Sequence, residues 1–205
     1  TRLIAPPKVA EARPDGTLAL RPFAAGWDAV AQDAWREVSA REITKRGGVF
    51  RGEWRQAEAA VVGRCHPGMG LQLLGEEVSD FELEVTVETI DAPEAGVVFR
   101  SDATADQCTR IACVAGRHQV ELVRVKAGRN YNAVGRGYLS LQTRFCALKA
   151  GEPFRLRVAA YGPYVEASVN GEVLLSGLTM HRRRGEIGLF AEDGTARFSD
   201  VRLRR

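Results

Sequence analysis

The chain has 205 residues with 29 Lys or Arg and 26 Asp or Glu, so its formal net charge is only +3. This small charge argues against nucleic-acid binding, which usually needs a much larger basic excess on one face. No stretch of the sequence approaches the roughly 18 consecutive apolar residues that cross a bilayer, so no membrane partner is expected. The length is sufficient for one domain with a full hydrophobic core.

The amino-terminal part of the chain is expected to be a linker or junction segment over residues 1–26, followed by one domain over residues 27–205. The segment is rich in Pro and Gly, and Pro14-Asp15-Gly16 within it predicts a turn. Alternation of larger apolar residues over residues 18–22 indicates a short strand.

One short helix is predicted next, over residues 28–40. Asp28 is a residue type that caps helix N-termini, and apolar side chains follow it at helical spacing. These are Val30, Ala34, Trp35 and Val38.

The cysteines and histidines give no sign of a metal or a cofactor, and we expect none. The four cysteines include no Cys-x-x-Cys pair, and the three histidines are far apart. Asp102 and Asp106 share one loop, but two carboxylates fall short of the six to eight oxygen ligands that calcium takes. The start of the chain lacks the pattern of a signal peptide. With no disulfide required by the spacing, we lean to a reducing, cytoplasmic location.

The rest of the chain has the two-residue period of β-strands. Phe81, Leu83, Val85 and Val87 alternate with polar residues, which places them on one face of a strand. Further strands are predicted over residues 96–100, 110–114, 119–125, 154–160, 164–170, 172–175, 186–191 and 196–203. Hairpin turns are indicated by Ala115-Gly116, Asn170-Gly171 and Asp193-Gly194. Strands at this spacing predict an all-β, two-sheet antiparallel sandwich.

The last fifty residues resemble one superfamily in particular. The order of segments is Phe154 to Val158, Val165 to Gly171, Gly185-Glu186-Ile187-Gly188-Leu189-Phe190, and Ala196-Arg197-Phe198-Ser199-Asp200-Val201. This order resembles the concanavalin A-like lectin and glucanase sandwiches. The resemblance covers roughly residues 52–205 and implies a jelly-roll fold and a carbohydrate-related function.

The amino end carries a second, shorter resemblance. Pro6-Pro7-Lys8-Val9, then Pro14 to Leu18, then Arg21-Pro22 are similar to the junction that leads into the C-terminal sandwich of β-fructosidases, the invertase and levanase family. That resemblance implies an accessory module of a glycoside hydrolase. The nucleophile, Arg-Asp-Pro and Glu-Cys motifs of that family are absent from this chain, so its chemistry does not carry over.

Two carboxylates stand out as candidates for catalysis, Glu82 and Glu84. Glycosidases use a pair of carboxylates, and same-face neighbours on a strand lie about 6.5–7 Å apart at the backbone. Alternating Glu is equally typical of a solvated sheet face, which is the explanation we favour. No catalytic residue is therefore assigned.

A sugar site needs aromatic faces and fixed polar groups in a concavity. The predicted carbohydrate-binding residues are Arg100, Arg124, Tyr164 and Asn170. Trp27, Trp35 and Trp54 are expected to pack in the core, because a buried Trp contributes a large apolar area. The loop over residues 126–137 is a further place for a ligand.

Three functions remain open at this stage. The first is a non-catalytic module that binds carbohydrate or packs on a catalytic glycosidase domain. The second is a self-contained enzyme resembling the bacterial 3-keto-disaccharide hydrolases. The third is a protein-interaction sandwich without sugar affinity. A shared fold cannot choose among them.

Overall fold

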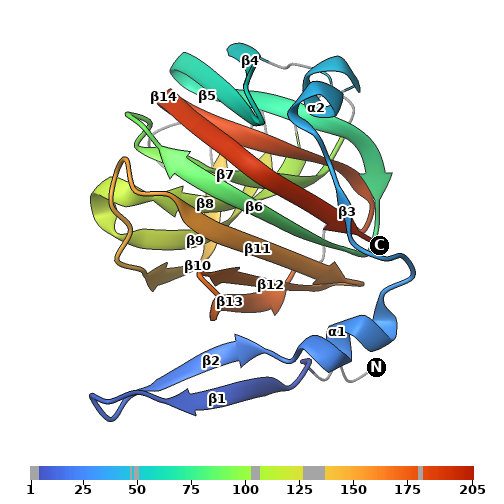
Figure 1. The fold of residues 1–205 in the computed structure, drawn as a ribbon, viewed down its shortest axis with the longest axis vertical. Helices are drawn as coiled ribbons and strands as arrows, with labels where there is room; N and C mark the ends of the chain where they lie inside the picture. The colour runs from blue at the N-terminus through green and yellow to red at the C-terminus, as the bar shows by residue number, and fades with distance from the viewer. Residues whose placement is uncertain (1–4, 47, 49–50, 103–106, 127–136, 180–181) are drawn as a thin grey trace.

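The computed structural model describes residues 5–46, 48, 51–102, 107–126, 137–179 and 182–205. They form a two-sheet antiparallel β-sandwich, as the sequence predicted (Figure 1). The strands are β1 (Lys8–Ala12), β2 (Leu18–Pro22), β3 (Arg36–Glu37), β4 (Glu53–Ala57), β5 (Ala60–Val78), β6 (Phe81–Thr89), β7 (Glu94–Ser101), β8 (Gln107–Val114), β9 (Gln119–Lys126), β10 (Tyr138–Phe145), β11 (Phe154–Tyr161), β12 (Tyr164–Val169), β13 (Glu172–Leu178) and β14 (Gly185–Arg204). The helices are α1 (Ala24–Val30) and α2 (Ala40–Arg46), with a 3-10 turn at Ala115–Arg117.

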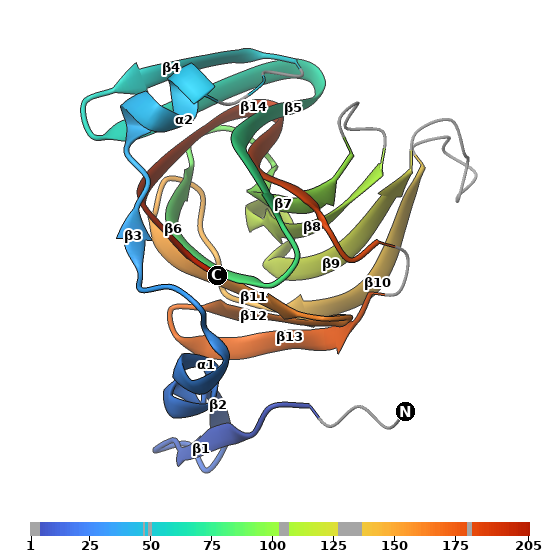
Figure 2. The same ribbon diagram turned by 90° about the vertical axis from the view of Figure 1, so that its right-hand side faces the viewer.

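Two long strands, β14 and β5, join the two sheets (Figure 2). The first half of β14 pairs with β7, which continues through β8 and β9 to β10. The second half pairs with β6, which continues through β11 and β12 to β13. We call the sheet that contains β6 the second sheet. Each of its strands has one face toward the core and one face outward.

The main core lies between the sheets and follows the predicted alternation. Leu83, Val85 and Val87 of β6 are at most 1% exposed and belong to one buried cluster with Val97 and Phe99 of β7. Burying a side chain of this size contributes about 1.5–3 kcal/mol. The four cysteines are free thiols in the structure, and burial raises the pKa of the Cys108 thiol to about 12.

Two of the three predicted hairpins are confirmed, including Ala115-Gly116 between β8 and β9, and one is wrong. Asn170 and Gly171 both have positive φ and turn β12 into β13, as expected. Asp193-Gly194 makes no hairpin. It lies inside the continuous strand β14, where the pairing with β5 shifts between Glu192 and Gly194. A β-bulge with a left-handed residue lets the strand bend from one sheet into the other. A Cβ at Gly194 would lie 2.6 Å from the backbone of Ala92.

The helix predicted over residues 28–40 is also wrong. The chain leaves helix α1 after Val30, because the backbone N–H groups of Gln32 and Asp33 bond the carbonyl of Arg205 instead of continuing the helix. Short strand β3 follows, and α2 begins only at Ala40.

The amino-terminal segment is more ordered than a linker. Its predicted turn and strand are present, and they form the β1–β2 hairpin. We call residues 5–35, which contain this hairpin and α1, the N-terminal strap. The strap lies against the outer face of the second sheet, beside β12 and β13 (Figure 1). Within the described residues, neither helix is long and apolar enough to cross a membrane.

Candidate functional site

A cavity of about 590 Å³ lies between the N-terminal strap and the outer face of the second sheet. Its volume is within the range of small-molecule sites, which is about 300–1,000 Å³. The strap contributes Pro22, Ala24, Asp28 and Trp35. The sheet contributes Glu82, Glu84, Arg155, Arg157, Ser168, Asn170, Gly171 and Arg204. We call this the strap cavity.

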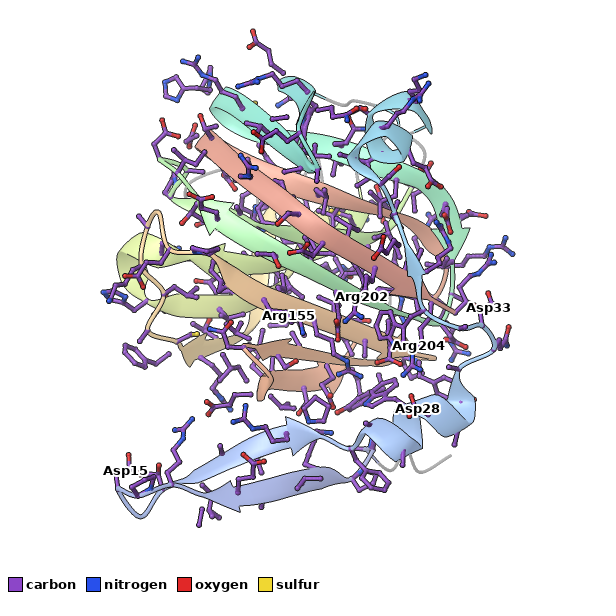
Figure 3. The ribbon with its side chains drawn as sticks, in the orientation of Figure 1. Asp15, Asp28, Asp33, Arg155, Arg202 and Arg204 are labelled. Carbon is purple, nitrogen blue, oxygen red and sulfur yellow. The ribbon has the colours of Figure 1, made fainter. Side chains whose placement is uncertain are left out.

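Strand alternation and register together create the polar wall of this cavity. Glu82 and Glu84 point outward from β6 because Leu83 and its apolar neighbours point into the core. On one side Arg204 lies opposite Glu82 in β14. On the other side Arg157 of β11 lies opposite Glu84. Figure 3 shows Arg155 on β11, Arg202 and Arg204 on β14, and Arg204 beside Asp28 of the strap.

Glu82 is held by two arginines. One carboxylate oxygen accepts a hydrogen bond from Nε of Arg157 at 2.9 Å, and the other accepts one from Nε of Arg204 at 2.6 Å. The Glu82 side chain is only 5% exposed. Both oxygens are therefore saturated by cations, so Glu82 is poorly placed to accept a substrate proton.

The pairing continues from Glu82 in both directions. Arg157 also donates to Glu166 at 3.1 Å, and Lys8 of the strap contacts the other oxygen of Glu166 at 2.6 Å. At the opposite end, Arg204 donates to Asp28 of α1 at 2.7 Å. The result is an alternating row of three cations and three anions, which we call the charge chain. Its members are Lys8, Glu166, Arg157, Glu82, Arg204 and Asp28.

The charge chain attaches the strap to the sheet. Burial lowers the pKa of Lys8, but its hydrogen bonds to Glu166 and Tyr164 outweigh that effect and raise the pKa overall. The contribution of Lys8 to stability is therefore complete below pH 10.5 and is lost as the pH rises through the raised pKa. Burial likewise opposes the charge of Arg204, and its contacts with Asp28 and Glu82 raise its pKa overall.

An apolar anchor lies beside these charges. Trp27 of α1 is 3% exposed and packs against Ala159 and Tyr164 in a small cluster apart from the main core. Its ring also lies 5.1 Å from the guanidinium of Arg157. Contacts of this kind stabilise a desolvated cation on an aromatic face.

Glu84 is the more available of the two carboxylates. One of its oxygens is paired with Arg202. Its other oxygen has no hydrogen-bond partner among the residues that the structure describes, and the side chain is 15% exposed. Trp35 lines the cavity from the strap side, with its ring 4.7 Å from the guanidinium of Arg204. The cavity thus combines an accessible carboxylate with an aromatic side chain.

The other end of the cavity carries groups without partners. The guanidinium of Arg155 makes no hydrogen bond or ion pair with any described residue, although three other arginines near it are paired. Ser168 is 1% exposed, and its hydroxyl likewise lacks a partner in the described part of the chain. Asn170 is fixed by its side-chain oxygen, which accepts the backbone N–H of Arg155 at 2.9 Å.

The structure brings some of the predicted site residues together. Glu82, Glu84 and Asn170 all line the strap cavity. Tyr164 lies behind it, where its hydroxyl donates to Glu166 at 3.1 Å. Tyr164 therefore supports the charge chain and does not line the cavity.

The two predicted arginines lie elsewhere. Arg100 is fully buried, and its guanidinium donates to the hydroxyl of Thr179 and the carbonyl of Gly162. Its donors are used inside the protein, and burial lowers its pKa. Arg124 is half-buried on β9 of the other sheet.

Several sequence-based interpretations fall partly outside the described residues. They include residues 127–136 of the predicted ligand loop, Asp106 of the loop judged too poor in carboxylates for calcium, and one of the three histidines, His181. Within the described residues, no group of three or more His, Cys, Asp or Glu could hold a metal ion.

Some residues of the cavity were not identified from the sequence. Trp35 was assigned to the core, and the arginines at 155, 157, 202 and 204 were not assigned any role. Their Arg-x-Arg spacing puts each pair on one strand face, which is visible in the sequence. The sequence does not show that these strands pair with β6, and it is this pairing that brings the arginines to the glutamates.

The described residues define an antiparallel β-sandwich domain, and comparison with known proteins places it in a family. Residues 24–204 match the model of the 3-keto-alpha-glucoside-1,2-lyase-like domain. The chain belongs to this family, which confirms the resemblance to the 3-keto-disaccharide hydrolases. No curated protein sequence gives a significant match.

Solved structures share the fold at low sequence identity. The carbohydrate-binding module CBM66 from Bacillus subtilis superposes with a TM-score of 0.70 at 18% identity, covering 78% of this chain and 96% of that one. A prokaryotic β-1,3-1,4-glucanase (lichenase) from a mouse hindgut metagenome gives 0.60 at 9% identity, covering 84% and 99%. A putative glycosyl hydrolase from Parabacteroides distasonis gives 0.58 at 15% identity, covering 84% and 99%.

Proposed function

We propose that this chain is a self-contained carbohydrate-active domain that binds a 3-keto-glycoside in the strap cavity and eliminates its aglycone, with Glu84 as the base. The observation that carries the proposal is the contrast between two neighbouring carboxylates. Glu82 has both oxygens bound by arginines, whereas Glu84 keeps one oxygen available on the cavity wall. The family assignment supplies the class of substrate.

The chemistry needs few groups. In a sugar with a ketone at C3, the hydrogen on C2 is acidic, and Glu84 accepts it as a proton. The electron pair moves toward the C3 oxygen, and collapse of this enolate breaks the bond between C1 and the leaving oxygen. The departing oxygen takes up a proton from water, and Glu84 releases to solvent the proton that it took from C2. The products are an unsaturated keto sugar and the free alcohol.

The cavity also provides for the charge that develops. Negative charge on the C3 oxygen is stabilised by donors fixed before the reaction begins. Arg204 and Arg157 contribute through their fixed positive charge, because the charge chain holds them on the cavity wall while their guanidinium nitrogens donate to Glu82, Glu166 and Asp28. Trp35 offers an apolar face for the sugar ring.

Replacing the base tests the proposal. We expect Glu84→Gln to lower turnover of a methyl 3-keto-α-glucoside by about 10²–10⁴-fold, the usual contribution of a general base. Release of methanol measures the rate. Glu88→Gln is the matched control, since Glu88 lies on the same face of β6 outside the cavity lining and is expected to keep full activity. Equal rates for both variants and the parent would contradict the role of Glu84.

A second candidate is the accessory module, which the fold match over 96% of a carbohydrate-binding module favours. In that case the isolated chain binds a glycan and releases no sugar, and Glu84→Gln leaves the affinity nearly unchanged. A module of the β-fructosidase type would bind a fructan such as levan. Calorimetric titration with levan and with the keto-glucoside, beside the rate measurement, separates the two candidates.

A further inference from the structure

The end of the strap cavity around Arg155 is built from unpartnered hydrogen-bond donors. The charge chain balances three cations with three anions, and Glu84 pairs with Arg202. This leaves one cationic side chain of the cavity, Arg155, without a carboxylate among the described residues. The nearest candidate by register is Asp200 of β14, but it is engaged by the hydroxyl of Thr86 at 2.9 Å.

Two neighbouring groups add to this donor end. The hydroxyl of Ser168 is buried in the cavity lining without a partner, and a buried polar group of this kind costs about 1–3 kcal/mol when it stays unpaired. Asn170 uses its side-chain oxygen to bind the backbone N–H of Arg155, so its amide nitrogen is the end left to donate. A guanidinium, an amide N–H and a hydroxyl together favour an acceptor-rich, anionic group.

The backbone holds these groups in place. Arg155 and Arg157 are on the same face of β11, and the backbone N–H of Asn170 donates to the carbonyl of Arg155 at 2.8 Å. Asn170 adopts a left-handed conformation (φ 49°), which the hairpin turn requires. The turn also brings its carbonyl to Arg21 of the strap, at 3.3 Å. Arg155 and Asn170 are themselves exposed, so the donor end is open to solvent where the hairpin turn meets the strap.

From these observations we infer that the preferred sugar carries an anionic substituent, and that Arg155 binds it. The group is a carboxylate, as in a uronic acid, or a phosphate ester. This inference rests on the proposed sugar site and specifies its substrate class. The planar guanidinium of an arginine can donate two parallel N–H bonds to either group. The preference therefore depends on the shape of the guanidinium as well as on its charge.

Titration calorimetry with three probes of the same ring tests this inference: methyl glucoside, methyl glucuronide and glucose 6-phosphate. We expect at least one acidic sugar to bind about 10-fold or more tightly than the neutral one, as one charge-assisted contact provides. This advantage should weaken as ionic strength rises, because screening acts on the charged contact alone. Arg155→Gln should abolish the preference for the acidic sugar, and Arg155→Lys should retain only part of it.

Arg55→Gln is the matched control. Arg55 is an exposed arginine of β4, outside the cavity lining, and its loss changes the net charge equally. We expect it to leave the preference for acidic sugars intact. Equal affinity for neutral and acidic sugars, or a preference that survives Arg155→Gln, would overturn the anionic subsite while leaving the sugar site standing. Absence of binding by all three probes would overturn the anionic subsite, whereas the sugar site itself is judged by titration with methyl 3-keto-α-glucoside.

Discussion

Glu82→Gln should lower the free energy of unfolding by about 3–5 kcal/mol, as expected when one partner of a buried ion pair is removed. The effect is large because Glu82 is the only carboxylate shared by Arg157 and Arg204 among the described contacts, and all three side chains are at most 10% exposed. A glutamine side chain has one acceptor oxygen where Glu82 has two, so its NH2 group would face one of the arginines as a second donor, and it carries no charge to compensate two buried cations. Urea denaturation measures the loss of stability, and the dependence of the unfolding free energy on urea concentration should stay unchanged.

The matched control for this prediction is again Glu88→Gln. Glu88 is half-buried on the same strand face, and no ion pair is present for it in the described part of the structure. Its substitution should change the stability by no more than about 0.5 kcal/mol. If Glu82→Gln and Glu88→Gln were equally mild, the charge chain would not be a structural element of the fold.

Trp27→Ala should detach the N-terminal strap while leaving the sandwich folded. Truncation of a buried Trp costs about 3–5 kcal/mol. Here the loss falls on a cluster that joins α1 to two residues of the second sheet and lies apart from the main core. Hydrogen exchange should show residues 8–30 losing protection while β6 and β14 keep theirs. Sugar binding should weaken at the same time, because Pro22, Asp28 and Trp35 form one wall of the cavity.

Phe23→Ala provides the control for the strap. Phe23 directly precedes α1 and is 39% exposed against 3% for Trp27, so its truncation removes less buried area. Exchange in residues 8–30 should stay as in the parent protein. Global loss of protection in Trp27→Ala, extending to β6 and β14, would show that the strap is part of the main folding unit and is not a separate attachment.

The sequence allowed the sandwich to be predicted because side-chain alternation is a local property. The outward direction of Glu82 and Glu84 follows from the apolar residues between them, without any knowledge of other strands. The same logic failed for β5, where Pro67 and several glycines interrupt the alternation over a long strand. It also failed at Asp193-Gly194, where a turn-like pair serves as a bulge in β14.

The site could be predicted only in part because it depends on register between distant strands. A shift of one residue in the pairing of β11 or β14 with β6 would turn their arginines to the core face, away from Glu82. Nothing local in the sequence sets that register. The position of Trp35 is likewise not set by its local sequence, since it depends on where the chain leaves α1. Arg100 was misplaced because it adopts a left-handed conformation one residue before the end of β7 and is buried against Thr179 and Gly162, which no local pattern indicates.

The most direct test of the sugar site is the indole N–H spectrum of the protein during titration with a methyl 3-keto-α-glucoside. The three tryptophans report on three places: Trp35 on the cavity wall, Trp27 in the strap anchor, and Trp54 against Phe198 at 5.9 Å between ring centres. Single Trp→Phe variants assign the signals. Saturable movement of the Trp35 signal with a stationary Trp54 signal is the expected result. A stationary Trp35 signal at saturating sugar, or shifts confined to residues of the other sheet, would contradict the placement of the ligand in the strap cavity.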